Sequence, residues 1–146
     1  MTITLRRTAI VVIVGLFSLS CRGPIELSMT ATDHINNDSG AKVVFVQLTN
    51  REAFDGLSAV DFWKDDNAAF TTDLAGNFKQ SLFLRPGEQT TIPIDLVKGA
   101  NFLGLAAAYR DPDPPQGWRV SYSIADVKGK TIELIFGPTS LRAEIR

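Results

Sequence analysis

Few residues in this chain have side chains that could do chemistry. Among 146 residues there is 1 Cys and 1 His. A single Cys excludes an intramolecular disulfide and a multi-Cys metal site. A single His excludes the zinc and iron sites that need two or three imidazoles. The cysteine, Cys21, follows a segment that predicts one particular covalent modification.

The chain begins with the pattern of a secretory signal peptide. Arg6 and Arg7 end a short basic segment, and the uncharged, mostly apolar run from Thr8 to Ser20 follows. This run is shorter than the ~20 residues that a membrane-spanning helix needs. We therefore expect residues 1–20 to be a signal peptide that is removed.

Cys21 lies where a lipoprotein signal peptide is cut. Ser20 directly precedes it, which resembles the lipobox of bacterial lipoproteins, where the cysteine is acylated. A plain signal peptide with an incidental cysteine is the alternative, although a free thiol is a liability in an oxidising compartment. We expect a covalent lipid at Cys21, no other cofactor, and a short tether over residues 21–23. In such lipoproteins an Asp directly after the cysteine favours retention in the inner membrane. Arg22 occupies that position here, so we expect the protein to be sorted to the outer membrane.

The other candidates for catalysis or metal binding have simpler explanations. His34 beside Asp33 could serve as a general base, but no distinctive nucleophile accompanies it, and a solvated loop histidine is expected. Asp111 and Asp113 lack the third carboxylate of a calcium loop. We expect Asp61, Asp65 and Asp66 to lie on a solvated helix face or to cap a helix. Trp63 and Trp118 are expected in the core. The sequence predicts no catalytic residue, no metal ligand and no enzyme.

The charge balance argues against nucleic acid as a partner. There are 15 Lys+Arg and 16 Asp+Glu residues, and the basic residues form no stripe. Without residues 1–20, which carry Arg6 and Arg7, the mature chain has a small excess of acidic groups.

Alternating hydrophobicity predicts a chain built mainly of strands. Ile25–Thr32 alternates as a half-buried strand does, and Val43–Thr49 reads as a strand buried on both faces. Six further strands are expected at Phe78–Leu84, Thr90–Leu96, Phe102–Tyr109, Trp118–Ala125, Thr131–Phe136 and Leu141–Ile145. Together they predict an all-β fold, a two-sheet antiparallel β-sandwich over residues 24–146.

One segment departs from this strand pattern. Between Arg51 and about Ala75, apolar residues recur at spacings of three and four, which predicts one or two short helices. Ser58 and Asp66 are placed as N-caps. The sandwich should therefore carry a helical insert at about residues 51–75.

The loop between the first two strands consists of residues that favour turns. Its members are Asp33, His34, Ile35, Asn36, Asn37, Asp38, Ser39 and Gly40. An apolar residue in a polar loop can be a partner contact or can fold back onto the core, and both remain open for Ile35.

In order along the chain, these features resemble the TssJ (SciN-type) lipoproteins of the bacterial type VI secretion system. The resemblance rests on the lipobox cysteine close to the first strand, the Ile35–Asp38 loop before a Val-rich strand, the Phe-rich insert containing Ala59–Phe62, and the run Leu84-Arg85-Pro86-Gly87, Gly104–Asp111 and Trp118-Arg119. Asn37 replaces the family's usual proline, and Gln47 stands where an aromatic residue is common.

The resemblance implies a function as well as a fold. It implies a transthyretin-like sandwich without catalysis, anchored in the outer membrane with its body in the periplasm. It implies binding to the periplasmic C-terminal region of the inner-membrane secretion protein TssM, with the Asp33–Gly40 loop taking part. In that role His34, Ile35 and Asn36 are the expected contacts. A monomer in isolation and several copies in the assembled complex are also implied.

Two other functions compete with this one. The first is a lipid-anchored periplasmic sandwich that binds a small apolar ligand in a cavity between its sheets. The second, more remote, is a membrane-anchored hydrolase that would depend on His34, the only imidazole in the chain.

Overall fold

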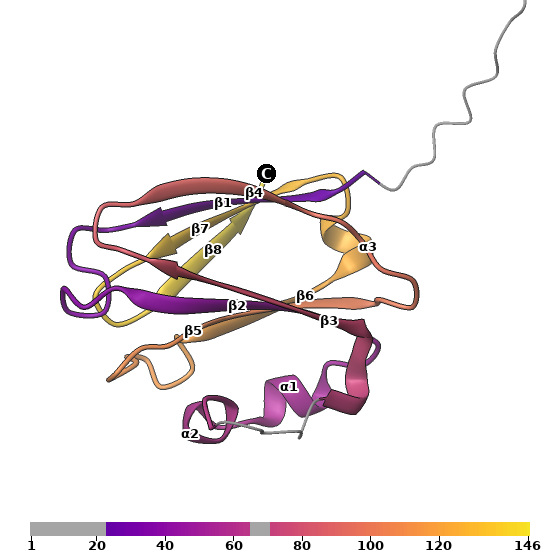
Figure 1. Ribbon diagram of the computed structural model, residues 1–146, viewed down its shortest axis with the longest axis horizontal. Helices are drawn as coiled ribbons and strands as arrows, with labels where there is room; N and C mark the ends of the chain where they lie inside the picture. Colours follow the sequence, from indigo (N-terminus) through magenta and orange to yellow (C-terminus); the bar gives the residue numbers. More distant parts are fainter. Residues whose placement is uncertain (1–22, 65–70) are drawn as a thin grey trace, which may run out of the picture.

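The computed structural model describes residues 23–64 and 71–146, in which eight strands form two stacked sheets (Figure 1). One sheet has the strand order β4-β1-β7-β8 and the other β3-β2-β5-β6. The strands are β1 (Ile25–Ala31), β2 (Ala41–Leu48), β3 (Leu74–Leu84), β4 (Gln89–Ile94), β5 (Phe102–Ala107), β6 (Arg119–Ser123), β7 (Thr131–Phe136) and β8 (Leu141–Ile145). No helix of this described part is long and apolar enough to cross a membrane.

Three of the sequence predictions fall where the structure says nothing. The signal peptide over residues 1–20, the lipidation site Cys21, and the acidic residues Asp65 and Asp66 lie outside the described residues.

The predicted two-sheet sandwich is confirmed, with one difference in strand direction. Each expected strand is present, and β1 shows the expected alternation, with Ile25 and Leu27 buried and Glu26 exposed. The sheets are not wholly antiparallel, however, because β1 runs parallel to β7, with Leu27 opposite Ile132. A parallel pair requires a long connection, and here the chain from β2 to β6 supplies it.

The predicted helical insert is also confirmed within the described residues. It contains α1 (Glu52–Gly56), α2 (Ala59–Phe62) and the 3-10 turn η1 (Thr71–Asp73). Ser58 caps α2 as expected, since its side-chain oxygen accepts a hydrogen bond from the Asp61 amide at 3.1 Å. The insert ends before its predicted limit, because β3 already begins at Leu74.

A third short helix was not predicted from the sequence. The strand expected over Trp118–Ala125 ends at Ser123, and α3 (Ile124–Val127) follows. Ile124 and Val127 are both buried, and the Ile124 amide donates to the Asn101 carbonyl at 2.9 Å. One helical turn is too short to show a helical period, so alternation in the preceding strand masked it.

β2 is covered on both faces of its sheet. Val43 and Phe45 are fully buried in the core. On the other face Val46 packs beside Gly104 of β5 and Phe54 of α1, and α1 and α2 lie against this outer side of the sheet (Figure 1). Burying a side chain such as Phe54 stabilises a fold by about 1.5–3 kcal/mol. The strand predicted at Val43–Thr49 is therefore buried on both faces because the insert provides a second apolar layer.

Arg119 holds the insert against β6. Its Nη1 donates to the carbonyl oxygen of Phe54 at 2.7 Å and to that of Leu57, and its Nη2 donates to the carbonyl of Asp55. The guanidinium carbon lies 4.6 Å from the ring centroid of Trp118. Burial lowers the pKa of Arg119, and the Asp55 carboxylate opposes that effect. The cation meets the carbonyl end of α1, where a positive charge is favoured.

Trp118 belongs to the core, as predicted. It is 1% exposed, and its ring centroid lies 5.2 Å from that of Phe62 and 6.5 Å from that of Trp63. Trp63 is half-buried beside it. The two tryptophans therefore close the seam between insert and sheet.

The close approach at Gly104 predicts a large effect from one added methyl group. A Cβ at this position would lie 2.8 Å from Val46 Cγ2 and 2.9 Å from Phe54 Cζ. We expect Gly104→Ala to lower the free energy of unfolding by about 1–3 kcal/mol, because the insert must move off the sheet. The measurement is urea unfolding of residues 22–146.

Gly56→Ala is the matched control for this substitution. Nothing lies within 4 Å of a Cβ added at Gly56, which is in α1. This variant should gain about 0.4–1 kcal/mol, since Ala restricts the unfolded chain. Equal stability of the two variants would contradict the packing described for β2.

Candidate functional site

The loop between β1 and β2 contains a left-handed backbone turn. Asn36, Asn37 and Asp38 have φ angles of 49°, 50° and 70°, and Gly40 has 69°. Asn and Asp tolerate this region better than other residues with a side chain. The Asn-Asn-Asp sequence is therefore suited to the turn observed.

Asn36 holds the loop through its side-chain amide. Its Nδ2 donates to the carbonyl oxygens of Gly40 at 2.8 Å and Ala108 at 3.2 Å, and its Oδ1 accepts from the Arg110 amide at 2.9 Å. The residue is 6% exposed. Buried hydrogen bonds of this kind fix a conformation, because leaving any partner unpaired costs free energy. Asn36 thus joins this loop to the segment after β5.

The open question about Ile35 is answered by its burial. Ile35 is 0% exposed and belongs to the core. Neither Ile35 nor Asn36 presents surface to a partner in this structure, so of the three expected contacts only His34 is exposed. Burying the apolar side chain and pairing the amide lower the free energy of the folded loop more than exposing them would. The exposed residues of the loop are Asp33, His34, Asn37, Asp38 and Ser39.

His34 forms an exposed pair with Asp38. Its Nδ1 lies 2.6 Å from Asp38 Oδ1, and both side chains are largely exposed. The pKa of His34 is raised because the Asp38 carboxylate accepts its hydrogen bond and stabilises its positive charge. Such a pair gives the loop a polar, charged tip. Among the described residues, no group of three or more His, Cys, Asp or Glu side chains is arranged to hold a metal ion.

The loop is also bound to two other connections at the same end of the sandwich. The amides of Asn36 and Asn37 donate to the carbonyls of Gly137 and Pro138, each at 3.2 Å. The Gly87 amide, in the β3–β4 turn, donates to the Thr32 carbonyl at 3.2 Å. Sequence reasoning missed these contacts. The partners are some 50 to 100 positions apart, and no local pattern indicates them.

The opposite end of the sandwich receives the N-terminal tether. The Glu26 amide donates to the Lys130 carbonyl at 3.1 Å, and a Cβ on Gly23 would lie 3.6 Å from the Gly129 Cα. Figure 1 shows the chain entering β1 beside α3, at the end away from the β1–β2 loop. Gly23, the last residue of the expected tether, is therefore positioned by the α3–β7 turn.

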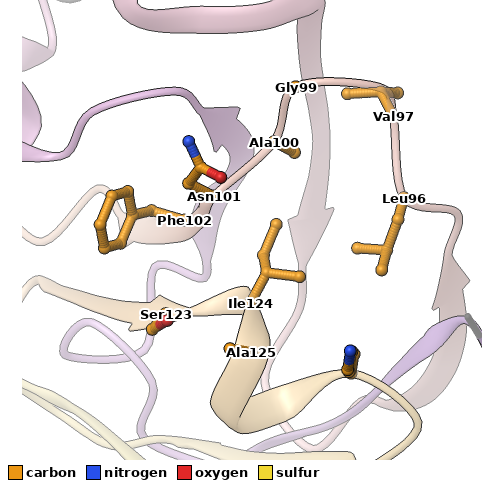
Figure 2. A pocket seen from close by; sticks show the side chains of 10 residues that line it. Leu96, Val97, Gly99, Ala100, Asn101, Phe102, Ser123, Ile124 and Ala125 are labelled. Carbon is orange, nitrogen blue, oxygen red and sulfur yellow. The ribbon is translucent and has the colours of Figure 1, made fainter.

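A hollow of about 390 Å³ lies at this tether end. It is lined by the β4–β5 connection and α3, and Figure 2 shows Leu96 and Ile124 facing each other across it. The ligand-binding alternative predicted a cavity between the sheets instead. That space is occupied by core side chains such as Phe45, Phe136 and Leu134. The hollow therefore does not correspond to the cavity that this alternative requires.

Comparison with known protein families identifies the chain. Residues 24–139 match the T6SS-SciN family, described as "Type VI secretion lipoprotein, VasD, EvfM, TssJ". The chain belongs to this family. The match covers most of the residues that the resemblance drew on, so the predicted family is confirmed. Comparison with curated proteins gives no significant match.

Solved structures of similar fold agree with this assignment for a type VI secretion lipoprotein. A chain of a structure described as "Type VI membrane complex" has a TM-score of 0.74 and 21% identity, covering 84% of this chain and 98% of the other. The lipoprotein TssJ1 from Pseudomonas aeruginosa has a TM-score of 0.70 and 22% identity, covering 84% and 97%. Serratia marcescens Lip, described as a membrane-bound component of the type VI secretion system, has 0.66 and 18%, covering 83% and 98%.

Membership also decides between the broad classes of function. The family is one of secretion-system lipoproteins and not of enzymes, which agrees with the sequence prediction. The type VI secretion lipoprotein is thus a membrane-bound structural component, and the hydrolase alternative has no support from its family.

The role of Asn36 predicts an unequal effect of two similar substitutions. Asn36 and Asn37 have nearly the same φ, but the structure describes side-chain hydrogen bonds only for Asn36. Asn36→Ala should lower the free energy of unfolding by about 2–4 kcal/mol, because three backbone groups lose their partner. Asn37→Ala carries the same backbone strain without that loss and serves as the control. Unfolding in urea measures both, and equal losses would show that the amide contributes nothing.

Proposed function

We propose that this type VI secretion lipoprotein anchors the secretion membrane complex at the outer membrane. In this role it binds the periplasmic C-terminal region of TssM through the Asp33–Gly40 loop. Family membership supports the role in secretion. A chain of similar fold, with a TM-score of 0.68 and 22% identity, comes from a structure described as "T6SS protein TssM C-terminal domain" from EAEC, and it covers 82% of this chain and 96% of the other.

The observation that carries the proposal is the position of the loop relative to the tether. β1 leads directly from the tether to the loop, and its 7 residues span about 23 Å at ~3.3 Å per residue. Only Arg22 and Gly23 separate Cys21 from Pro24. A lipid on Cys21 would therefore hold one end of the sandwich at the membrane and direct the loop away from it, toward a periplasmic partner (Figure 1).

The loop has the properties that favour specific recognition. Its backbone is fixed by hydrogen bonds to the Gly137–Pro138 turn and to the segment after β5, so little conformational entropy is lost on binding. Its exposed tip offers the His34–Asp38 pair and Asn37, which can form hydrogen bonds with a complementary polar surface.

The first test is a titration with the C-terminal periplasmic region of TssM from the same bacterium. Residues 22–146 should bind it, and Asp38→Asn should weaken binding by about tenfold by removing the charge of an exposed contact. Asp126→Asn, the same change on α3 at the tether end, should leave binding unchanged. No detectable binding of the wild type at about 50 μM would overturn the proposed function.

The second test concerns the anchor. Cys21→Ser should abolish labelling by radioactive palmitate and release the protein from the membrane fraction or leave it unprocessed, because no acyl chain can be attached. Ser39→Ala, in the distant loop, should keep the label. Labelling that persists in Cys21→Ser would show that the lipid is attached elsewhere.

A further inference from the structure

The tether end of the sandwich carries three exposed lysines on two neighbouring turns. Lys128 and Lys130 flank Gly129, which lies against Gly23 of the tether. Lys98 lies in the β4–β5 connection, between residues that line the same hollow as Lys128. Within the described part of the chain, no ion pair engages any of the three.

Three acidic residues also lie at the tether end of the sandwich. The Glu26 carboxylate, on β1, accepts a hydrogen bond from Thr131 Oγ1 at 3.4 Å. Asp95 lies at the start of the β4–β5 connection, and Asp126 is exposed on α3. The Lys98-Gly99 and Lys128-Gly129-Lys130 turns carry positive side chains, and Asp95 and Asp126 lie three and two positions before them.

The hollow between these turns has a mixed lining, in which apolar side chains lie beside Asn101, Ser123 and Lys128. Leu96, Val97, Ala100 and Phe102 are half-buried there, and Ile124 is buried. A concave, partly apolar surface with lysines beside it is complementary to a phospholipid, which combines an anionic phosphate with hydrocarbon. Its volume of about 390 Å³ is also within the range of sites that hold small molecules.

The short stretch of chain between Cys21 and β1 determines how far this end of the sandwich can lie from the membrane surface. Gly23 follows Cys21 by two positions, with only Arg22 between them, so the two residues lie at most about 7 Å apart. Charges beside Gly23 thus lie within about one Debye length, ~8 Å, of the surface that holds the lipid. This step depends on the lipid attachment at Cys21, which belongs to the proposed function.

We propose that Lys98, Lys128 and Lys130, together with the hollow between them, form a phospholipid-binding face. This face seats the sandwich on the membrane leaflet that holds its own lipid anchor. The lipid anchor alone would leave the body free to rotate about the short tether. Contact of the lysines with anionic headgroups fixes one orientation, in which the Asp33–Gly40 loop projects away from the bilayer.

The test measures lysine reactivity in the acylated protein. The full chain is expressed, and the processed protein is purified from membranes and placed in vesicles of phosphatidylglycerol and phosphatidylethanolamine or of phosphatidylcholine alone. Modification by an amine-reactive acetylating reagent is followed for each lysine by mass spectrometry. The three lysines should react about threefold more slowly on the anionic vesicles, and 1 M salt, where the Debye length is about 3 Å, should remove the difference.

Lys42 and Lys79 serve as internal controls because they are exposed on β2 and β3, away from the tether. Their rates should be the same on both kinds of vesicle. Equal rates at all five lysines would overturn the proposal. Protein that fails to associate with either vesicle would instead overturn the lipid anchor on which it depends.

A variant separates headgroup contact from simple proximity. On anionic vesicles, contact with headgroups should slow amide hydrogen exchange in the β4–β5 connection of the wild-type protein. The triple variant Lys98→Gln, Lys128→Gln and Lys130→Gln should lose this slowing. The triple variant Lys42→Gln, Lys79→Gln and Arg85→Gln removes the same charge elsewhere and should keep it. The first variant should bind TssM in solution as the wild type does, so that a failure of partner binding is recognised separately. Slow exchange that persists in the first variant would contradict the proposal.

Discussion

The burial of β2 on both of its faces is the constraint on which the rest of the structure depends. One face, with Val43 and Phe45, completes the core between the sheets, and the other, with Val46, needs a second apolar layer. Phe54 of the insert supplies that layer, and Gly104 provides the space for it. Arg119 then donates hydrogen bonds to the carbonyl groups at the end of α1 and so fixes the insert to β6. The insert is therefore an integral part of the fold and not an appendage.

Two buried amides tie the ends of this apolar body to the loops around it. Asn36 and Gln47 are the polar side chains that lie buried within the described residues. Gln47 donates to the Asp95 carbonyl at 2.7 Å and accepts from the Val97 amide at 3.0 Å, which links β2 to the connection leaving the other sheet. Asn36 performs the corresponding role at the opposite end. Because each amide satisfies backbone groups from a different segment, each end has one defined arrangement of loops.

This arrangement gives the two ends of the molecule different chemistry. One end has a loop with exposed polar groups, and the other has Gly23, two lysine-bearing turns and a partly apolar hollow (Figure 1, Figure 2). A protein that holds a membrane complex in place needs both a firm attachment and a recognition surface at a fixed distance from it. The short strand β1 connects the two directly, so the distance between them changes little as long as the sheet is intact.

The strands, the insert and the family could be predicted from the sequence because they depend on local patterns. Alternation in Ile25–Ala31, the apolar run in β2 and the Ser58 cap are read from neighbouring residues, and the turn chemistry of Asn36-Asn37-Asp38 is equally local. The burial of Ile35, the pairing of Asn36 with Ala108 and Arg110, the parallel pair β1–β7 and the hollow that the β4–β5 connection shares with α3 could not be predicted. Each joins residues far apart in the chain, and only the packing of two sheets and their connecting loops brings those residues together.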